Sequence, residues 1–198
     1  MSYSKKEIVY FDKVGPINTN NTFRFAKERM KELSINKVLV ASDYGNSAVL
    51  ALDYFKPKEL VVVAPMYGFG KPGATTFKEE NRALLKEAGV SIIHNTHVFA
   101  GIDRAINQRY GGITHVQLVA QILKMQGEGF KVCLEIATMA ADCGMVGVED
   151  EVISIAGTLR GADTAIVVIP CHTNNFLETQ IREIICIPRV RLSKPQPL

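Results

Sequence analysis

The stretch Val38-Leu-Val-Ala-Ser-Asp-Tyr-Gly-Asn-Ser47 decides how this chain folds. It opens with an apolar run of the β type and continues as a short polar turn, and a second apolar run begins at Ala48. This order predicts a strand, a tight turn and a helix, a junction that leaves unpaired N–H groups at the positive end of the helix dipole. The turn is therefore a candidate phosphate site. The alternative is an ordinary turn in which Ser47 only caps the helix.

The residues of the turn suit an anion. Gly45 lets the backbone approach closely, and the hydroxyl groups of Ser42 and Ser47 can donate hydrogen bonds to it. Polar side chains just before the first predicted helix are expected to add support, or to act there as a simple helix cap. The expected phosphate contacts are Ser42, Gly45, Asn46 and Ser47, supported by Asn18 and Thr19.

The composition is that of an ordinary globular chain. The 198 residues are 47% hydrophobic and 22% charged, with a formal net charge of +3. We expect one domain over residues 1–188 and a C-terminal tail over 189–198. The basic residues are scattered, which argues against nucleic acid as a partner. No apolar run reaches the length of a membrane span, and no secretory signal opens the chain, so we expect a cytoplasmic protein.

Neither the cysteines nor the histidines form a metal-binding pattern. The cysteines lack C-x-x-C spacing, so reduced thiols are expected rather than a zinc site. His94 and His97 follow a predicted strand at a spacing of three, with Asp103 nearby, but a third convergent ligand is missing. We therefore expect no metal, and expect instead a loop histidine that touches the ligand or a neighbouring backbone. The four cysteines are Cys133, Cys143, Cys171 and Cys186.

Strand-like and helical patterns alternate along the first half of the chain. Continuous apolar runs such as 61–64 and 165–169 are typical of strands buried on both faces. Together with the intervening helices they predict an α/β fold with a mostly parallel sheet. The last run stops before Pro188, which predicts an edge strand. The predicted strands are 8–11, 38–41, 60–64, 90–94, 131–136, 152–156, 164–169 and 183–187, and capping boxes are predicted at 76–79 and 114–117.

Ligands of such sheets bind beyond the carboxyl ends of the strands. The segments that follow the predicted strands are rich in Gly, Asn, Thr and Ser, so we expect them to converge on one rim. His172 follows the strand 164–169 and is expected there, in contact with the ligand, although a plain polar turn is the alternative. These segments are 42–47, 65–76, 95–101, 137–142, 157–161 and 171–176.

Glu135 interrupts an apolar run, and a carboxylate in that setting needs a partner. On a predicted strand Lys131 cannot face Glu135, so Arg160 or a group of backbone amides is the expected partner. We favour such structural pairing over a role for Glu135 as a general base.

Several segments together resemble a family of stand-alone proteins named after the C-terminal α/β domain of pyruvate kinases. In that domain a similar strand, turn and helix holds a sugar phosphate of the allosteric activator. The resemblance covers nearly all of residues 7–189. The segments that carry it are Ile8-Val-Tyr-Phe11, Asn18-Thr19, Ala41-Ser42 with Gly45, Lys131-Val-Cys-Leu-Glu135, Met139-Ala-Ala-Asp142, Arg160-Gly-Ala-Asp163 and Glu183-Ile-Ile-Cys-Ile-Pro-Arg189.

The resemblance implies a three-layer α/β/α sandwich with a mixed sheet and a phosphate-bearing ligand at its rim. Flavin mononucleotide (FMN) is the implied cofactor, and a homo-oligomer is the implied assembly. Pyruvate kinase activity is not implied, because it resides in a separate barrel of roughly 250 residues. Ile17 and the glycine-rich segment 68–73 depart from the family pattern.

The expected function is binding, or sensing, of a phosphorylated small molecule, FMN first. One alternative is a flavin-dependent oxidoreductase or another enzyme acting on a phosphorylated metabolite, with Glu135 or His172 in an acid–base role. A second alternative is an assembly domain whose phosphate site is vestigial.

Overall fold

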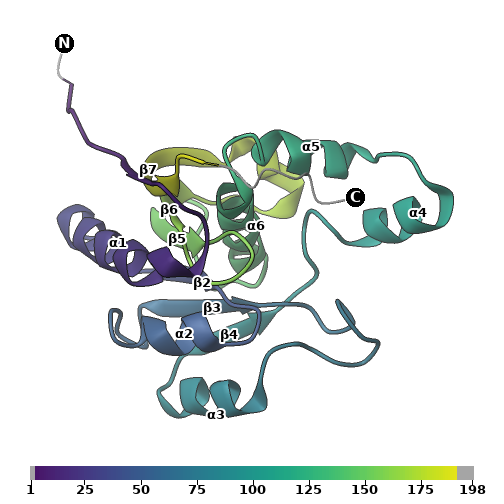
Figure 1. The fold of residues 1–198 in the computed structure, drawn as a ribbon, viewed down its shortest axis with the longest axis horizontal. Coiled ribbons are helices and arrows are strands. Elements are labelled where there is room, and N and C mark those ends of the chain that lie inside the picture. Colours follow the sequence, from purple (N-terminus) through teal and green to yellow (C-terminus); the bar gives the residue numbers. More distant parts are fainter. Residues whose placement is uncertain (1–2, 191–198) are drawn as a thin grey trace.

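The computed structural model describes residues 3–190, and its centre is one seven-stranded sheet with the order β1-β7-β6-β5-β2-β3-β4 (Figure 1). The predicted tail at 189–198 falls mostly outside the described residues. The strands are β1 (Val9–Phe11), β2 (Val38–Ala41), β3 (Leu60–Ala64), β4 (Ser91–His94), β5 (Val152–Ala156), β6 (Thr164–Ile169) and β7 (Gln180–Pro188).

Six strands run in one direction and β6 alone runs against them. The pairs β1–β7, β2–β5, β2–β3 and β3–β4 are parallel, whereas β6 is antiparallel to both of its neighbours, β5 and β7. The carboxyl ends of six strands therefore meet at one rim of the sheet, and the carboxyl end of β6 lies at the other.

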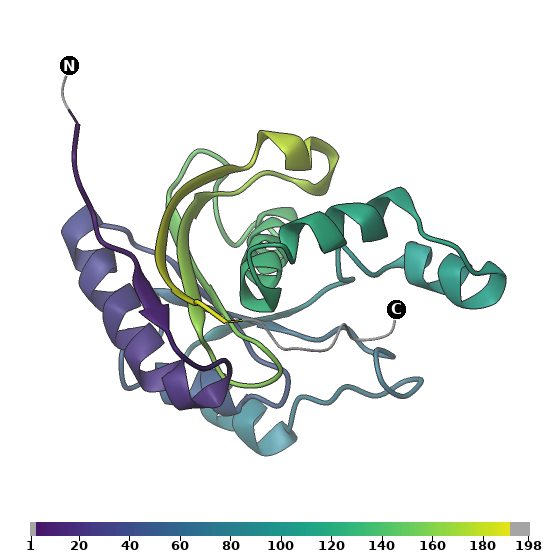
Figure 2. The same ribbon diagram turned by 45° about the horizontal axis from the view of Figure 1, so that its top comes forward.

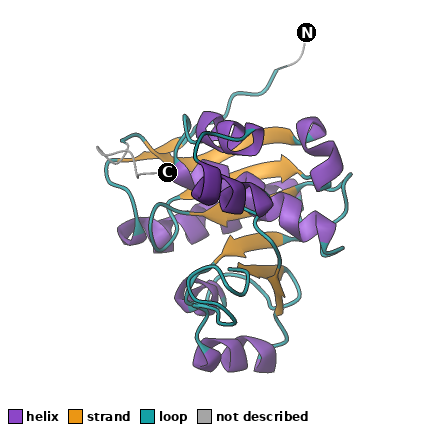
Figure 3. Ribbon diagram, turned by 90° about the vertical axis from the view of Figure 1, so that its right-hand side faces the viewer, coloured by secondary structure: helices purple, strands orange, loops and turns teal. Residues whose placement is uncertain are grey.

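Helices cover both faces of the sheet and give the three-layer α/β/α architecture that the sequence predicts (Figures 2 and 3). One core joins α1, α2 and α3 to alternate strand residues such as Val38 and Val40, and a second core joins α6 to the opposite face through Leu39. The helices are α1 (Thr19–Leu33), α2 (Asn46–Ala51), α3 (Glu79–Glu87), α4 (Ile102–Tyr110), α5 (His115–Leu123) and α6 (Glu128–Asp142), with 3₁₀ turns η1 (Pro16–Asn18) and η2 (Thr173–Glu178).

Two predictions about strands are wrong. Residues 131–136 belong to helix α6 rather than to a strand, because α6 is buried on almost every side and so lacks the polar face that marks a surface helix. The last strand, β7, is antiparallel to β6 but is not at an edge, since β1 pairs with its other side.

Local capping signals were partly informative. The capping box at Thr114 and Gln117 is present at the start of α5. The one expected at Thr76 is absent, since α3 begins only after Lys78, and the Thr76 hydroxyl instead donates to Asp43. Within residues 3–190 no helix combines the length and the apolar character needed to cross a bilayer.

Candidate ligand-binding cleft

A cleft of about 610 Å³ lies at the rim where the parallel strands end. It opens beside the carboxyl end of β2, between the connection toward β3 on one side and the end of β5 on the other. Open α/β sheets commonly bind ligands at such a switch point in the strand order. Its walls come from the β2–α2 turn, the loop after β5, the start of α1, the loops after β3 and β4, and one side of α6 from Glu128 to Met139.

The β2–α2 turn brings donors to the cleft. Ser42 is buried, and its hydroxyl oxygen accepts a hydrogen bond from the Ala48 N–H at 3.3 Å, which caps α2. Within residues 3–190 no acceptor binds the backbone N–H groups of Gly45, Asn46 or Ser47, and the Ser47 hydroxyl also has no partner. The turn therefore offers several unused donors.

Gly45 is required for packing rather than for close approach of a ligand. Its φ is +92°, a left-handed value that favours glycine. A Cβ placed there would lie 2.6 Å from Cβ of Asn81 and 3.1 Å from the ring of Phe77. The open side of Gly45 thus faces α3, while the Asn46 and Ser47 side chains line the cleft.

The loop after β5, residues 157–161, is held rigidly from behind. Asp163 is fully buried, and its carboxylate accepts hydrogen bonds from Gly15 N at 2.8 Å and Thr158 N at 3.1 Å. The Thr19 hydroxyl accepts from Ala162 N at 3.0 Å and donates to the Pro16 carbonyl oxygen at 2.8 Å. These bonds lock the loop against the start of α1.

The front of this loop presents an apolar and a cationic side chain to the cleft. Leu159 has a φ of +66° and is 68% exposed although it is a leucine. The Arg160 guanidinium reaches the β2–α2 turn, where it lies 4.8 Å from the centre of the Tyr44 ring. Left-handed residues held in place by their surroundings are often found at binding sites.

A buried ion pair forms the floor of the cleft on α6. The Lys131 ammonium and the Glu135 carboxylate are 2.6 Å apart, with side chains 12% and 7% exposed. The second oxygen of Glu135 accepts from Phe99 N at 3.1 Å. Arg160 or a group of backbone amides was expected as the partner of Glu135. One backbone amide, Phe99 N, does bind it, but Arg160 lies against Tyr44, and the charged partner is Lys131, which the helix places one turn from Glu135.

The two histidines after β4 have different surroundings. His94 is bound through both ring nitrogens, to Arg82 at 2.9 Å and to the Pro65 carbonyl at 2.7 Å. His97 lines the cleft against the Phe69 ring, and burial lowers the pKa of its imidazole below the usual value. His97 is therefore the histidine of the two that faces the cleft, and its lowered pKa favours the neutral form.

The structure brings four of the seven predicted site residues to the cleft wall: Thr19, Ser42, Asn46 and Ser47. Gly45 lies in the same turn but faces Asn81. Asn18 is buried beneath the wall, where its amide donates to the Lys13 carbonyl at 2.6 Å.

His172 does not line the cleft. It follows β6, the one strand that runs against the others, so it emerges at the opposite rim. There its ring lies 3.3 Å from Asp142, the last residue of α6. His172 thus lies beyond the end of α6, whose residues line the cleft only as far as Met139.

Tyr44 and Lys131 are among the cleft residues that the sequence did not single out as contacts. For Lys131, the four-residue spacing from Glu135 could have indicated an ion pair. That spacing brings the two side chains together only if the segment is a helix.

No family model matches this chain. Among solved structures, an NH3-dependent NAD synthetase from Campylobacter jejuni, in complex with the nitrate ion, is similar at a TM-score of 0.37 with 13% sequence identity. The likeness covers 68% of this chain and 53% of that one, so the chain spans about half the length of the protein it matches. A likeness at this level does not bear on function.

Proposed function

We propose that the chain binds a phosphorylated small molecule in this cleft, with FMN as the first candidate. One observation carries the proposal: the carboxylates of the cleft are engaged by protein donors, whereas several donors remain unused. Asp43 accepts from Thr76, Glu128 pairs with Lys124 at 3.2 Å, and Glu135 pairs with Lys131. The surplus of donors favours a ligand rich in acceptors, such as a phosphate ester.

The residues present fit a ligand with a phosphate at one end and a ring system at the other. The amides and hydroxyl of the β2–α2 turn would bind the phosphate, and Arg160 is close enough to the turn to share it. Tyr44, Leu159 and Phe69 supply apolar surface for a ring. The cleft volume lies within the roughly 300–1,000 Å³ of ordinary small-molecule sites. FMN bound here would supply a redox-active ring.

The test measures the affinity of the purified chain for FMN and for riboflavin, which has the same ring but no phosphate. We expect FMN to bind at least about 10-fold more tightly, since hydrogen bonds to a charged group contribute about 1.5–3 kcal/mol. Ser47→Ala and Arg160→Ala should each weaken FMN binding about 10-fold and leave riboflavin binding nearly unchanged. His172→Ala is the matched control and should bind like the unaltered chain.

Thermal unfolding can contradict the proposal. A ligand that binds only the folded state must raise its stability. If neither FMN nor sugar phosphates raise the melting temperature, the proposal is wrong and the alternative of an assembly domain with a vestigial site gains support.

A second candidate is an enzyme, either a flavin-dependent oxidoreductase or one acting on a phosphorylated metabolite. The specific observation in its favour is His97, a neutral imidazole at the cleft beside the Lys131–Glu135 pair. A neutral imidazole near physiological pH can accept a proton. Loss of the flavin absorbance on addition of a nicotinamide donor, diminished in His97→Asn, would support this candidate, and an unchanged spectrum would exclude the oxidoreductase.

A further inference from the structure

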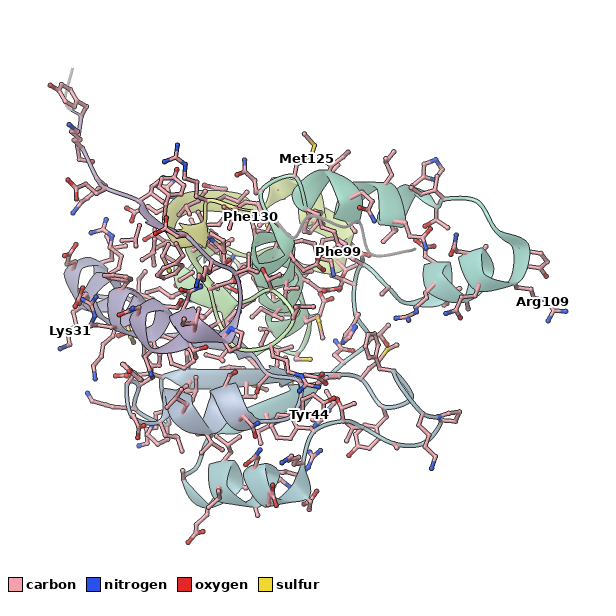
Figure 4. All side chains as sticks on the ribbon, viewed as in Figure 1. Lys31, Tyr44, Phe99, Arg109, Met125 and Phe130 are labelled. Carbon is pink, nitrogen blue, oxygen red and sulfur yellow. The ribbon has the colours of Figure 1, made fainter. Side chains whose placement is uncertain are left out.

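A smaller cavity of about 120 Å³ lies where α6 packs against α5 and η2, and it shares no lining residue with the cleft. In Figure 4 the labelled Phe99 lies beside α6 and below α5. Five of the seven lining residues are apolar and two are threonines. The lining is Val98, Phe99, Val116, Val119, Thr138, Thr173 and Phe176.

Two aromatic rings line this cavity. The rings of Phe99 and Phe176 meet edge to face, with their centres 5.2 Å apart and their planes at 86°. Val116 and Val119 contribute branched aliphatic groups from α5. Close contact with such groups stabilises an apolar molecule through many small dispersion attractions.

Thr138 gives the cavity a polar group that lacks a partner. Thr138 is fully buried in α6, and within residues 3–190 its hydroxyl has no hydrogen-bond partner. The hydroxyl of Thr173, the other threonine of the lining, donates to Asp142. A buried hydroxyl without a partner is unfavourable, and such groups are uncommon in native proteins. A bound molecule with one hydrogen-bonding atom would supply the missing partner.

The size and lining of the cavity suit a compact apolar molecule better than water. A buried water usually makes about three hydrogen bonds, whereas Thr138 alone among the described lining residues carries an unpaired polar side-chain atom. In another protein, an engineered apolar cavity of about 150 Å³ stays dry and binds benzene. A molecule of about that size therefore matches the volume here.

We propose that this cavity binds a compact apolar molecule that carries one hydrogen-bonding oxygen, such as an aromatic ring with a single hydroxyl group. The ring would pack against Phe99 and Phe176, and the oxygen would bind Thr138. A hydroxyl group both donates and accepts, so it can pair with Thr138 in either role. The proposal is independent of the ligand proposed for the cleft, because the two linings are separate.

Phe99 connects this cavity with the floor of the cleft. Its backbone N–H donates to Glu135, and the centre of its ring lies 5.5 Å from the Lys131 ammonium. A molecule in the cavity therefore contacts the residue that binds the buried ion pair of the cleft.

The first experiment titrates the purified chain with phenol and with toluene, which share a ring and differ in a hydroxyl or a methyl group. Backbone NMR signals give the affinity and the location of binding. Both probes should bind, with the largest shifts at Phe99, Thr138 and Phe176. Largest shifts in the β2–α2 turn, or no saturable binding of either probe, would overturn the proposal.

The second experiment tests the hydroxyl of Thr138. Thr138→Val keeps the shape of the side chain and removes its hydroxyl group. Phenol should bind at least about 5-fold more weakly to this variant, since its own hydroxyl is then buried without a partner. Toluene should bind at least as tightly as it does to the unaltered chain. An equal change for both probes would overturn the assignment of Thr138 as the partner of the oxygen.

The third experiment fills the cavity. Val119→Phe should abolish the binding of both probes, whereas Leu118→Phe, at an exposed position on α5 outside the lining, should leave it unchanged. A circular dichroism spectrum shows whether each variant is folded, and Val116→Phe fills the same space if Val119→Phe is unfolded. Undiminished binding of the probes by a folded filling variant would overturn the proposal.

Discussion

Lys131 and Glu135 form an ion pair of 2.6 Å across one turn of α6, and both side chains are almost entirely buried in the wall of the cleft. A buried charge deprived of its partner is strongly unfavourable, whereas a pair replaced by apolar residues often leaves stability unchanged. Loss of one member of this pair should therefore lower the free energy of unfolding more than replacement of both members by apolar residues.

Lys131→Met is expected to lower the free energy of unfolding by about 3–5 kcal/mol, because Glu135 keeps only its bond from Phe99 N. The double variant Lys131→Met/Glu135→Leu should recover most of this loss. Urea unfolding measures both. The control is Lys124→Met, which breaks the more exposed pair with Glu128 and should cost at most about 1 kcal/mol. A double variant as unstable as Lys131→Met would contradict the expectation.

His97 should make the fold less stable in mild acid. Burial lowers its pKa in the folded chain, so the unfolded chain takes up the proton first as the pH falls. Stability due to His97 is thus complete above about pH 7 and is lost as the pH falls through the lowered pKa. The groups that act on its ring are Glu135, Lys131, Arg104 and Asp43.

The measurement compares urea unfolding of the unaltered chain and of His97→Asn from about pH 7.5 to 5. The variant should lose stability less steeply toward acid. His115→Asn, at an exposed position, should keep the slope of the unaltered chain. Identical slopes in all three would show that His97 does not carry this dependence.

Gly45→Ala should be more harmful than Gly68→Ala, although both glycines have a positive φ. At Gly68 an added Cβ meets nothing within 4 Å, so only the left-handed backbone matters, about 1–2 kcal/mol. At Gly45 the same strain is joined by a contact of 2.6 Å with Asn81, which adds about 1–3 kcal/mol. Thermal unfolding ranks the two, and equal melting temperatures would refute this account of Gly45.

Asp163→Ala should loosen the loop at 157–161. The N–H groups of Gly15 and Thr158 both donate to Oδ2 of Asp163, and the substitution leaves both without an acceptor. We expect a loss of about 2–4 kcal/mol and weaker ligand binding, measured by unfolding and by titration. Asp53→Ala, at an exposed position, should change neither.

The layered α/β architecture was predictable, because the apolar runs around Val38 and Ile166 are short, continuous and separated by helical patterns. The helical state of 131–136 was not. A short apolar run such as Val132-Cys-Leu fits a buried strand and a buried helix equally well. That single ambiguity hid the pairing of Lys131 with Glu135.

The site was predictable on one side only. The β2–α2 turn follows from local sequence, so Ser42, Asn46 and Ser47 could be placed at the cleft. The position of His172 depends on the direction of β6, which is set by pairing with β5 and β7 rather than by the residues of β6. A contact that depends on the direction of a strand cannot be predicted from the local sequence pattern of that strand.

The carboxyl end of β6 marks a second rim of the sheet, opposite the cleft. Residues at that rim can be substituted without altering the cleft. The segment from Gly144 to Glu151 joins α6 to the start of β5 and contributes nothing to the cleft. A fluorescent label or a short peptide inserted near Val148, which is 38% exposed, would thus report on the protein without disturbing the cleft.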